Sequence, residues 1–554
     1  MSTRAAASLK RALTRASTCG STTSSCRMRS CHHISNISCS FTSCAAPLRN
    51  DHSVRSAATV KPTTSTINAA DPVHGSQYAP PELLTVLQET IKTHGALPVS
   101  RYMTLCLSHP TLGYYSTRNV FGSSGDFITS PEISQVFGEL LAIWFVTQWA
   151  AQGAPSKVRI VELGPGKGTL LADVLGTLKT LPQASTRPVT AIHLVESSEA
   201  LRKVQKAKLA SSGFGDVETR WWDNAVEVPP SEDEFTIVIA HEFFDALPIH
   251  IFENTPKGWR EVLVDVADPK KAVVPNSPTE PLRLVLAPGP TPASTLYTRL
   301  STLVATPASR TSASSSLSFD TTLPPSNATP PSGPQPSAGS AEPVSSLTLA
   351  RFARLPVGSR IEISPASWEV AQSVGKLFSS SSSPKGAAGL IIDYGDAKAF
   401  GRSWRGFRKH AVVDPLSEPG HTDLTANVDF AYLTEALAEH GERFSIGFGM
   451  SEIVLLTQAL VGGSSSPAST HGLLSQRTFL RSLGLDARLS SLLRNAPMER
   501  QNEIASAAER LIDKFGMGTQ YKVMAITPKG NQEGSAFPFV EGVEEALDRA
   551  ERGS

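Results

Sequence analysis

Glycines and a carboxylate end the apolar run at residues 161–168, which reads Val-Glu-Leu-Gly-Pro-Gly-Lys-Gly. A strand that runs into such a turn lets a ligand approach main-chain N–H groups, because glycine lacks a side chain and tolerates positive φ. The Gly-x-Gly-x-Gly spacing differs from the Gly-x-Gly-x-x-Gly of dinucleotide enzymes, so a nicotinamide enzyme is the less favoured alternative. We predict that Glu162, Gly164, Gly166 and Gly168 bind S-adenosylmethionine, a nucleoside with an amino-acid tail.

Two more carboxylates stand where the next strands should end. Glu196 follows the apolar stretch 190–195, and Asp223 follows Trp221 and Trp222. A carboxylate at the first position can accept hydrogen bonds from both hydroxyls of a ribose, and one at the second can bind an adenine amino group. Each feature alone also fits a tight loop or a solvated strand end. Their order along the chain favours a cofactor site of the class I methyltransferase type.

A third cluster, Ile-Ala-His-Glu-Phe-Phe-Asp-Ala-Leu-Pro at 239–248, follows the fourth predicted strand. Ligands of open α/β sheets bind outside the carboxyl ends of the strands, so this segment should lie near the transferred methyl group. A carboxylate there can orient a nitrogen acceptor and take its proton, while a phenylalanine walls the site. The structural alternative is that the two phenylalanines pack in the core and Asp245 caps a helix.

The elements that must hold these residues alternate between strand-like and helix-like segments, which predicts an α/β fold with a Rossmann-like sheet. In the helix at 133–150, apolar residues recur with a period of 3.6, and we expect Thr129 to cap it and Glu132 to complete a capping box. The other predicted helices are 170–179, 199–209, 429–440 and 498–514. The predicted strands are 158–163, 190–195, 235–240, 389–393 and 521–526.

The first 50 residues contain no Asp or Glu but seven Lys or Arg, and they hold five of the six cysteines. Residues 1–57 therefore have the composition of a mitochondrial presequence, although a plain disordered tail would share it. The cysteine spacing of this leader does not match a zinc site, so we expect no metal. Of the 51 basic residues, seven lie here, which leaves 44 against 50 acidic residues, a net charge of −6. This balance argues against a nucleic-acid binder.

Residues 305–346 are so rich in Ser, Thr, Pro, Ala and Gly that they cannot bury a core, and we predict a disordered insertion. It divides one methyltransferase domain into a first part at 80–304, which opens with an N-terminal helical segment, and a second part at 347–530. Residues 531–554 form a C-terminal tail. No apolar run is long enough for a transmembrane helix, so we expect no membrane insertion.

These residues closely resemble the MidA-like mitochondrial protein arginine methyltransferases, the complex I assembly factor 7 family. The resemblance covers roughly residues 80–300 and 349–528. Besides the motifs above, it includes Gly125, Asp126 and Phe127, which the family places against the cofactor. The matching strings are 102–103, 109–115, 125–134, 137–139, 161–168, 194–196, 240–248, 258–262, 393–395, 405–407, 423–430 and 476–480.

The resemblance implies an enzyme of the mitochondrial matrix that uses S-adenosylmethionine to dimethylate arginine symmetrically. The family's substrate is the 49 kDa-type core subunit of complex I, modified during assembly. For such a cationic acceptor, Glu242 is the first candidate to hold the guanidinium, Asp245 the second, and His241 a proton acceptor. Two other functions stay open: an assembly chaperone that only binds the cofactor, and a small-molecule methyltransferase.

Overall fold

The computed structural model describes residues 82–117, 129–180, 189–267, 281–304, 352, 355–379, 385–438, 468–529 and 536–552. All of them belong to one compact unit, Pro81–Ser554. The predicted presequence at 1–57, the predicted insertion at 305–346, and Gly125, Asp126 and Phe127 lie outside the described residues.

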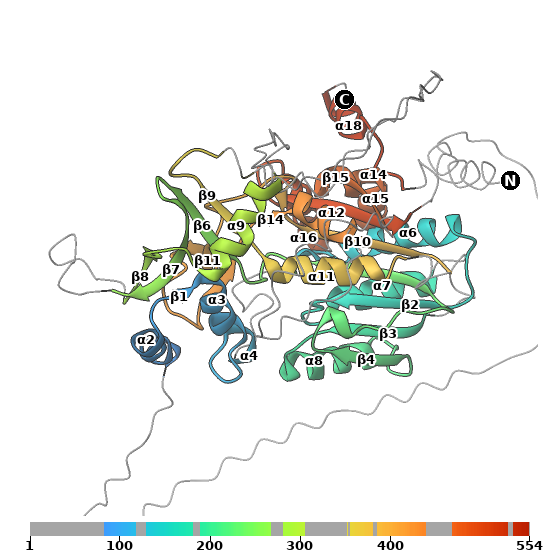
Figure 1. The fold of residues 1–554 in the computed structure, drawn as a ribbon. Helices are drawn as coiled ribbons and strands as arrows, with labels where there is room; N and C mark the ends of the chain where they lie inside the picture. The colour runs from blue at the N-terminus through green and yellow to red at the C-terminus, as the bar shows by residue number, and fades with distance from the viewer. Residues whose placement is uncertain are drawn as a thin grey trace, which may run out of the picture. The chain divides into compact units, whose positions relative to one another are not determined.

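The largest sheet among the described residues has eight strands (Figure 1). Five strands are parallel, and they follow the spatial order β4, β3, β2, β5, β10. β16 lies antiparallel to β10, and β15 lies antiparallel to β16. The bounds are β2 Val158–Leu163, β3 Val189–Val195, β4 Glu218–Trp222, β5 Phe235–His241, β10 Ala387–Asp396, β14 Val428–Asp429, β15 Ala468–Ser475 and β16 Tyr521–Pro528.

Alternate residues of these strands enter different cores, as the period-2 geometry of a strand requires. Ile160 and Ile237 pack into one hydrophobic cluster together with α6 (Gln135–Ala151) and α7 (Thr169–Thr180). Val161 enters the other, which includes α11 (Pro365–Lys376) and α12 (Phe430–Ala438). Because both faces are covered, β2 and β5 are buried along their whole length. The α/β architecture and all five predicted strands are confirmed.

The predicted helix at 133–150 is divided at Ser134. A short α5 (Ser130–Ile133) precedes α6, and Ser134 has an extended backbone whose hydroxyl accepts a hydrogen bond from the Val136 N–H. Thr129 occupies the N-cap of α5, but its side chain makes no capping hydrogen bond. The predicted capping box is therefore wrong. The other predicted helices are confirmed as α7, α8 (Glu199–Ser211), α12 and α16 (Met498–Ile512).

Two smaller sheets are inserted into this core, and the sequence did not predict their strands. One contains β1 (Leu97–Pro98), β6 (His250–Thr255), β7 (Gly258–Val266), β8 (Leu282–Leu286) and β9 (Arg360–Ile363). The other contains β11 (Arg405–Arg408), β12 (Ala411–Val413) and β13 (Asp423–Thr425). The N-terminal helices α2 (Leu83–His94), α3 (Val99–Ser108) and α4 (Tyr114–Thr117) share a hydrophobic cluster with both sheets.

The end of the chain packs onto the core rather than leaving it. The indole N–H of Trp144 in α6 donates a hydrogen bond to the Phe537 carbonyl at 3.0 Å, and the Phe539 ring packs edge-on against Trp144. The last helix is α18 (Val543–Arg552), and Glu544 at its start accepts a hydrogen bond from the Ser475 N–H at 2.8 Å. Among the described helices, none has the length and apolarity that spanning a bilayer requires.

Candidate active site

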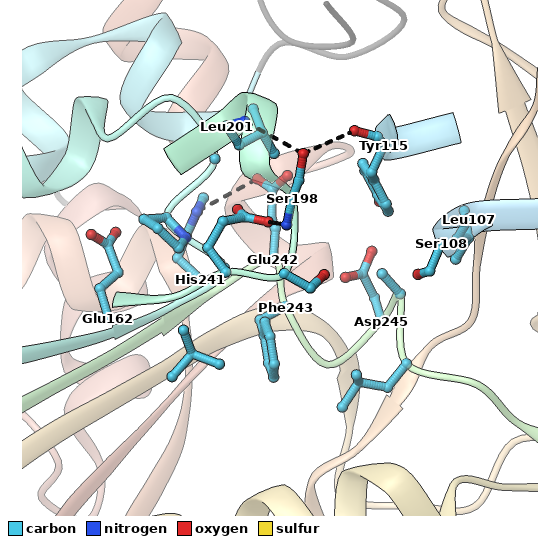
Figure 2. Close-up of a pocket in the computed structure, with 18 of the residues that line it drawn as sticks. Leu107, Ser108, Tyr115, Glu162, Ser198, Leu201, His241, Glu242, Phe243 and Asp245 are labelled. Atoms are coloured by element: carbon cyan, nitrogen blue, oxygen red, sulfur yellow. Dashed lines mark hydrogen bonds and ion pairs between the residues drawn. The ribbon is translucent and has the colours of Figure 1, made fainter. Parts of the chain in front are cut away.

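A cavity of about 1130 Å³ opens beyond the carboxyl ends of β2, β3 and β5 (Figure 2). Small-molecule sites usually measure about 300–1,000 Å³, so this one has room for a cofactor and part of a second substrate. It brings together eight predicted site residues: Glu162, Gly164, Gly166, Glu196, Asp223, His241, Glu242 and Asp245. Gly168 is not among the residues that line it.

The glycine turn has two functions that its spacing alone did not separate. Gly164 has a φ of +63°, and a Cβ there would lie 2.7 Å from Cδ2 of Phe243, so the ring fits only against a glycine. Gly168 also has a positive φ, +77°, but a Cβ there would meet Gln205 at an ordinary 3.7 Å. Gly164 therefore shapes the cavity wall, whereas Gly168 serves the start of α7.

The carboxylate of Glu196 is held at the end of β3. One of its oxygens accepts a hydrogen bond from the Ser198 N–H at 2.8 Å, and the other accepts one from the Gln205 amide at 3.2 Å. Asp223 is more exposed and forms an ion pair with Arg202 at 2.5 Å. Both carboxylates line the cavity and keep lone pairs for further donors.

Glu162 is the penultimate residue of β2 and lies in apolar surroundings. Only 3 % of the residue is exposed, and burial raises the pKa of its carboxyl to about 8. Its Oε2 has no hydrogen-bond donor among the described residues. A buried carboxyl that lines a cavity in this condition is suited to a cationic ligand group.

Glu242 has the strained backbone of the site. Its φ is +50°, a region that non-glycine residues seldom adopt, and its N–H donates to the Ile392 carbonyl at 3.0 Å. Burial first, and then the charge of Asp245, raise the pKa of Glu242 to about 8, although a hydrogen bond from the Tyr521 hydroxyl opposes them. Nε2 of His241 lies 3.4 Å from Oε1 of Glu242, and burial lowers the pKa of His241 to about 3. His241 is therefore neutral and a weak proton acceptor.

Asp245 accepts a hydrogen bond from the Tyr394 hydroxyl, and its Oδ1 has no donor within the described part of the chain. Burial raises the pKa of this carboxyl to about 6. No helix follows Asp245, so the alternative that it caps a helix is wrong. The two phenylalanines differ in role: Phe244 packs in the core, as the structural alternative expects, whereas Phe243 lines the cavity, as the functional one expects.

Asp393, three residues before the end of β10, was missed as a site residue. Its Oδ2 accepts hydrogen bonds from three consecutive N–H groups, those of Phe243, Phe244 and Asp245, at 3.1–3.3 Å. Its Oδ1 accepts a fourth from Tyr394 at 2.9 Å. One buried carboxylate thus fixes the turn that carries Glu242 and Asp245. The available signal was its position as the last residue of the predicted strand 389–393.

Tyr115 and Asp423 complete the wall, and the sequence assigned neither of them a role. The Tyr115 hydroxyl donates to Asp423 at 3.0 Å, and both residues line the cavity. Figure 2 shows Asp245 on the same side of the cavity as Tyr115 and Ser108. Tyr115 comes from α4 and Asp423 from β13, so this part of the wall is built from distant segments.

Buried carboxylate oxygens without donors concentrate in this cavity. Within the described residues they are Glu132 Oε2, Glu162 Oε2, Glu242 Oε1 and Asp245 Oδ1, and all four residues line it. Buried polar atoms are normally hydrogen-bonded, and unpaired ones are expensive to maintain. The site is therefore complementary to ligands that bring positive charge and several N–H donors.

Known proteins resemble this chain over most of its length. The family model described as "Putative S-adenosyl-L-methionine-dependent methyltransferase" matches residues 140–448. The mouse protein named "Protein arginine methyltransferase NDUFAF7, mitochondrial" is 31% identical over 490 residues, which cover 84% of this chain and 89% of the mouse protein. The Drosophila melanogaster homolog of that name is 32% identical over 475 residues, covering 83% and 86%.

Solved structures share the fold. A Burkholderia thailandensis protein crystallised with S-adenosyl-homocysteine matches with a TM-score of 0.55 and 23% identity, covering 82% of this chain and 94% of that one. A native crystal structure from the same organism matches with a TM-score of 0.54. At this identity the likeness supports the architecture described above and nothing finer.

Proposed function

The chain belongs to the family of S-adenosylmethionine-dependent methyltransferases that includes the NDUFAF7 proteins, and from that premise we propose that it methylates an arginine side chain of a protein. Its cofactor is S-adenosylmethionine. The cofactor supplies, when bound, a methyl group already activated by a sulfonium. What the chain must add is therefore alignment of the acceptor nitrogen, exclusion of water and removal of a proton.

Three features of one end of the cavity fit the cofactor. The positive-φ turn at Gly164 and Gly166 leaves main-chain groups open to a ligand. Glu196 retains acceptor capacity for ribose hydroxyls. Glu162 offers a buried oxygen without a donor, which suits an α-ammonium group. We propose these residues, with Asp223 near the adenine, as the cofactor site.

The observation that carries the choice of acceptor is the pair of donor-less oxygens on Glu242 and Asp245. A guanidinium has five N–H donors in a plane and stays charged at any pH the protein tolerates, so it can satisfy both carboxyls at once. We propose that Asp245 holds the guanidinium and that Glu242 binds the nitrogen to be methylated.

Methylation of a guanidinium nitrogen releases one N–H proton, and a group of the chain must receive it. Glu242 is better suited than His241, because its pKa is raised to about 8 while that of His241 is lowered to about 3. An incoming guanidinium favours the ionised carboxylate and so prepares Glu242 to take the proton. The role of proton acceptor thus passes from His241 to Glu242 in our proposal.

The relatives named above carry the word mitochondrial in their names, and the composition of residues 1–57 agrees with import. We propose that the protein acts in the mitochondrial matrix. We further propose that it dimethylates the 49 kDa-type core subunit of complex I symmetrically and so supports assembly of the complex. These finer statements rest on the family resemblance.

The test incubates the purified protein, without residues 1–57, with methyl-labelled cofactor and the candidate subunit, followed by peptide mapping. We expect label on arginine as symmetric dimethylarginine, and none with Gly164→Val. Label on a small molecule alone would overturn the protein substrate. If no arginine is labelled while the cofactor and the subunit both bind, the chaperone reading replaces catalysis.

A further inference from the structure

Arg405, in β11, stacks on the tyrosine that holds Asp245. Its Cζ lies 4.8 Å from the centroid of the Tyr394 ring and 5.4 Å from that of Phe407. Its Nη1 donates to the Ser403 carbonyl at 2.8 Å and to Oδ1 of Asn427 at 2.7 Å. A guanidinium held between two rings and two acceptors has a defined plane, and Arg405 itself does not line the cavity.

The contact continues to the acceptor carboxyl, because the Tyr394 hydroxyl donates to Asp245. We propose that Arg405 is a positioning residue for Asp245, acting through the ring and hydroxyl of Tyr394. This inference rests on the role proposed for Asp245 in binding the acceptor. It also gives the inserted three-stranded sheet a task in the reaction that lies outside the cavity.

The five-stranded sheet that contains β9 supports the two groups that Arg405 binds. Glu362 of β9 accepts hydrogen bonds from the N–H groups of Ser403 and Trp404 at 2.8 and 3.2 Å, and from the Ser403 hydroxyl. The Ser403 hydroxyl oxygen in turn accepts one from the Asn427 N–H at 2.8 Å. The Glu362 carboxyl thus fixes both hydrogen-bond acceptors of Arg405, Ser403 directly and Asn427 through the Ser403 hydroxyl.

Charge explains why a cation is needed here. Several elements pack against Asp245 and bring titratable groups close to it or to its neighbours. These groups are Glu242, Asp393, Tyr394, Tyr521, Tyr115, Asp423 and Arg405. Of these groups, the carboxyls of Glu242 and Asp393 favour a protonated Asp245, whereas Arg405 and the hydrogen bond from the Tyr394 hydroxyl favour its ionised form. Loss of Arg405 should therefore make Asp245 harder to ionise.

The kinetic test compares Arg405→Gln, Arg405→Lys and a matched control, Arg408→Gln, which lies on the same strand and pairs with Glu418. For Arg405→Gln we expect the lower inflection of the acid limb of kcat/KM, which belongs to Asp245, to move up by about one pH unit, while the upper inflection, which belongs to Glu242, stays in place; KM for the acceptor should rise about tenfold. Arg405→Lys should restore the acid limb but not KM, since it keeps the charge and loses the planar stack. Affinity for S-adenosyl-homocysteine should stay within twofold in all three variants.

A wild-type pH profile and KM in Arg405→Gln would overturn the proposal, and so would an equal loss at every pH accompanied by weaker cofactor binding. If the wild type methylates no arginine, the proposed function fails, and thermal unfolding still decides the role of Arg405. The folded pKa of Asp245 is raised from 3.8 to about 6. The protonated carboxyl therefore stabilises the fold at low pH, and this contribution is lost as pH rises through about 6. Arg405→Gln should therefore cost more in Tm at pH 8 than at pH 5, and the difference should vanish in an Asp245→Asn background. An equal cost at both pH values contradicts the coupling.

Discussion

The two ends of the cavity are built in different ways. At the end that we propose binds the cofactor, called the cofactor end, Glu162 and Gly164 flank the last residue of β2, and Glu196 and Asp223 directly follow β3 and β4; these three strands are consecutive in the chain and adjacent in the sheet. At the end that we propose binds the acceptor, called the acceptor end, the wall combines the loop after β5 with α4, β10 and β13, segments up to 308 residues apart in sequence. A cofactor common to many enzymes can be bound by a local motif, whereas an acceptor site needs side chains that only the complete fold brings together.

The hydrogen bonding differs in the same sense. The carboxylate of Glu196 has protein donors on both oxygens before any ligand arrives. Glu242 and Asp245 each keep one buried oxygen without a donor, and the turn between them is held by Asp393. The acceptor end thus combines two such carboxyls with the positive φ of Glu242, whereas the cofactor end has one, Glu162; strain and desolvation together are common at reacting residues. Variants at the two ends should therefore fail in different ways.

The largest effect should come from Glu242→Gln, which keeps the shape of the side chain and removes its charge. We expect kcat to fall by about 10²–10³, the usual contribution of a positioned proton acceptor, while the Kd for S-adenosyl-homocysteine changes less than twofold. Single-turnover kinetics and calorimetry measure the two quantities. Glu369→Gln is the control, since Glu369 is an exposed residue of the same cavity. Full activity of Glu242→Gln would remove Glu242 from the mechanism.

The cofactor end should respond in binding instead. Gly164→Ala places a Cβ 2.7 Å from the Phe243 ring, and we expect the Kd for S-adenosyl-homocysteine to rise roughly 100-fold, or about 3 kcal/mol. Gly168→Ala is the matched control, because its φ is also positive while its nearest contact lies at 3.7 Å. Its cost should be about 1 kcal/mol of folding stability. Equal losses of affinity in both variants would mean that backbone strain, and not the contact with Phe243, limits this end.

Asp393→Asn should give an intermediate effect at the acceptor end. An amide retains one acceptor oxygen, so either the three N–H bonds to the turn or the one to Tyr394 loses its partner, at about 1–3 kcal/mol. We expect kcat to fall about tenfold and Tm to drop. Asp396→Asn, at the exposed end of the same strand, should leave both unchanged. A drop in Tm with wild-type kcat would show that Asp393 stabilises the fold without positioning Glu242.

The difference between the two ends also explains what the sequence could predict. The apolar strands β2, β3 and β5, the glycine turn after β2 and the carboxylate after β3 are local patterns, so the sequence predicts the parallel core of the sheet, the turn and the position of Glu196. Several strands of the two smaller sheets are short and only partly buried, such as β8 and β12, which weakens their period-2 pattern. Tyr115 and Asp423 are 308 residues apart, and no local pattern connects them. The positive φ of Glu242 depends on contacts with β10 and is not encoded in its residue type.

The smallest predicted effect is on thermal stability. It concerns the two buried carboxyls whose pKa values are raised to about 8, Glu162 at the cofactor end and Glu242 at the acceptor end. A carboxyl with a folded pKa above its unfolded value stabilises the fold at low pH, and this contribution is lost as pH rises through about 8. Glu162→Gln should therefore raise Tm by about 1–3 °C at pH 8.5 and leave it unchanged at pH 5. A Tm increase of the same size at both pH values would point to packing rather than ionisation.

Glu162 and Glu242 should differ in whether they release a proton when S-adenosyl-homocysteine binds. At pH 7 Glu162 is mostly protonated, and the α-ammonium group of S-adenosyl-homocysteine favours its ionised form, so binding should release up to about one proton. Calorimetry in two buffers of different ionisation enthalpy measures this release. Glu162→Gln should abolish it, whereas Glu242→Gln should retain it, because Glu242 faces the acceptor. If Glu242→Gln abolishes the release instead, the assignment of the two ends of the cavity is reversed.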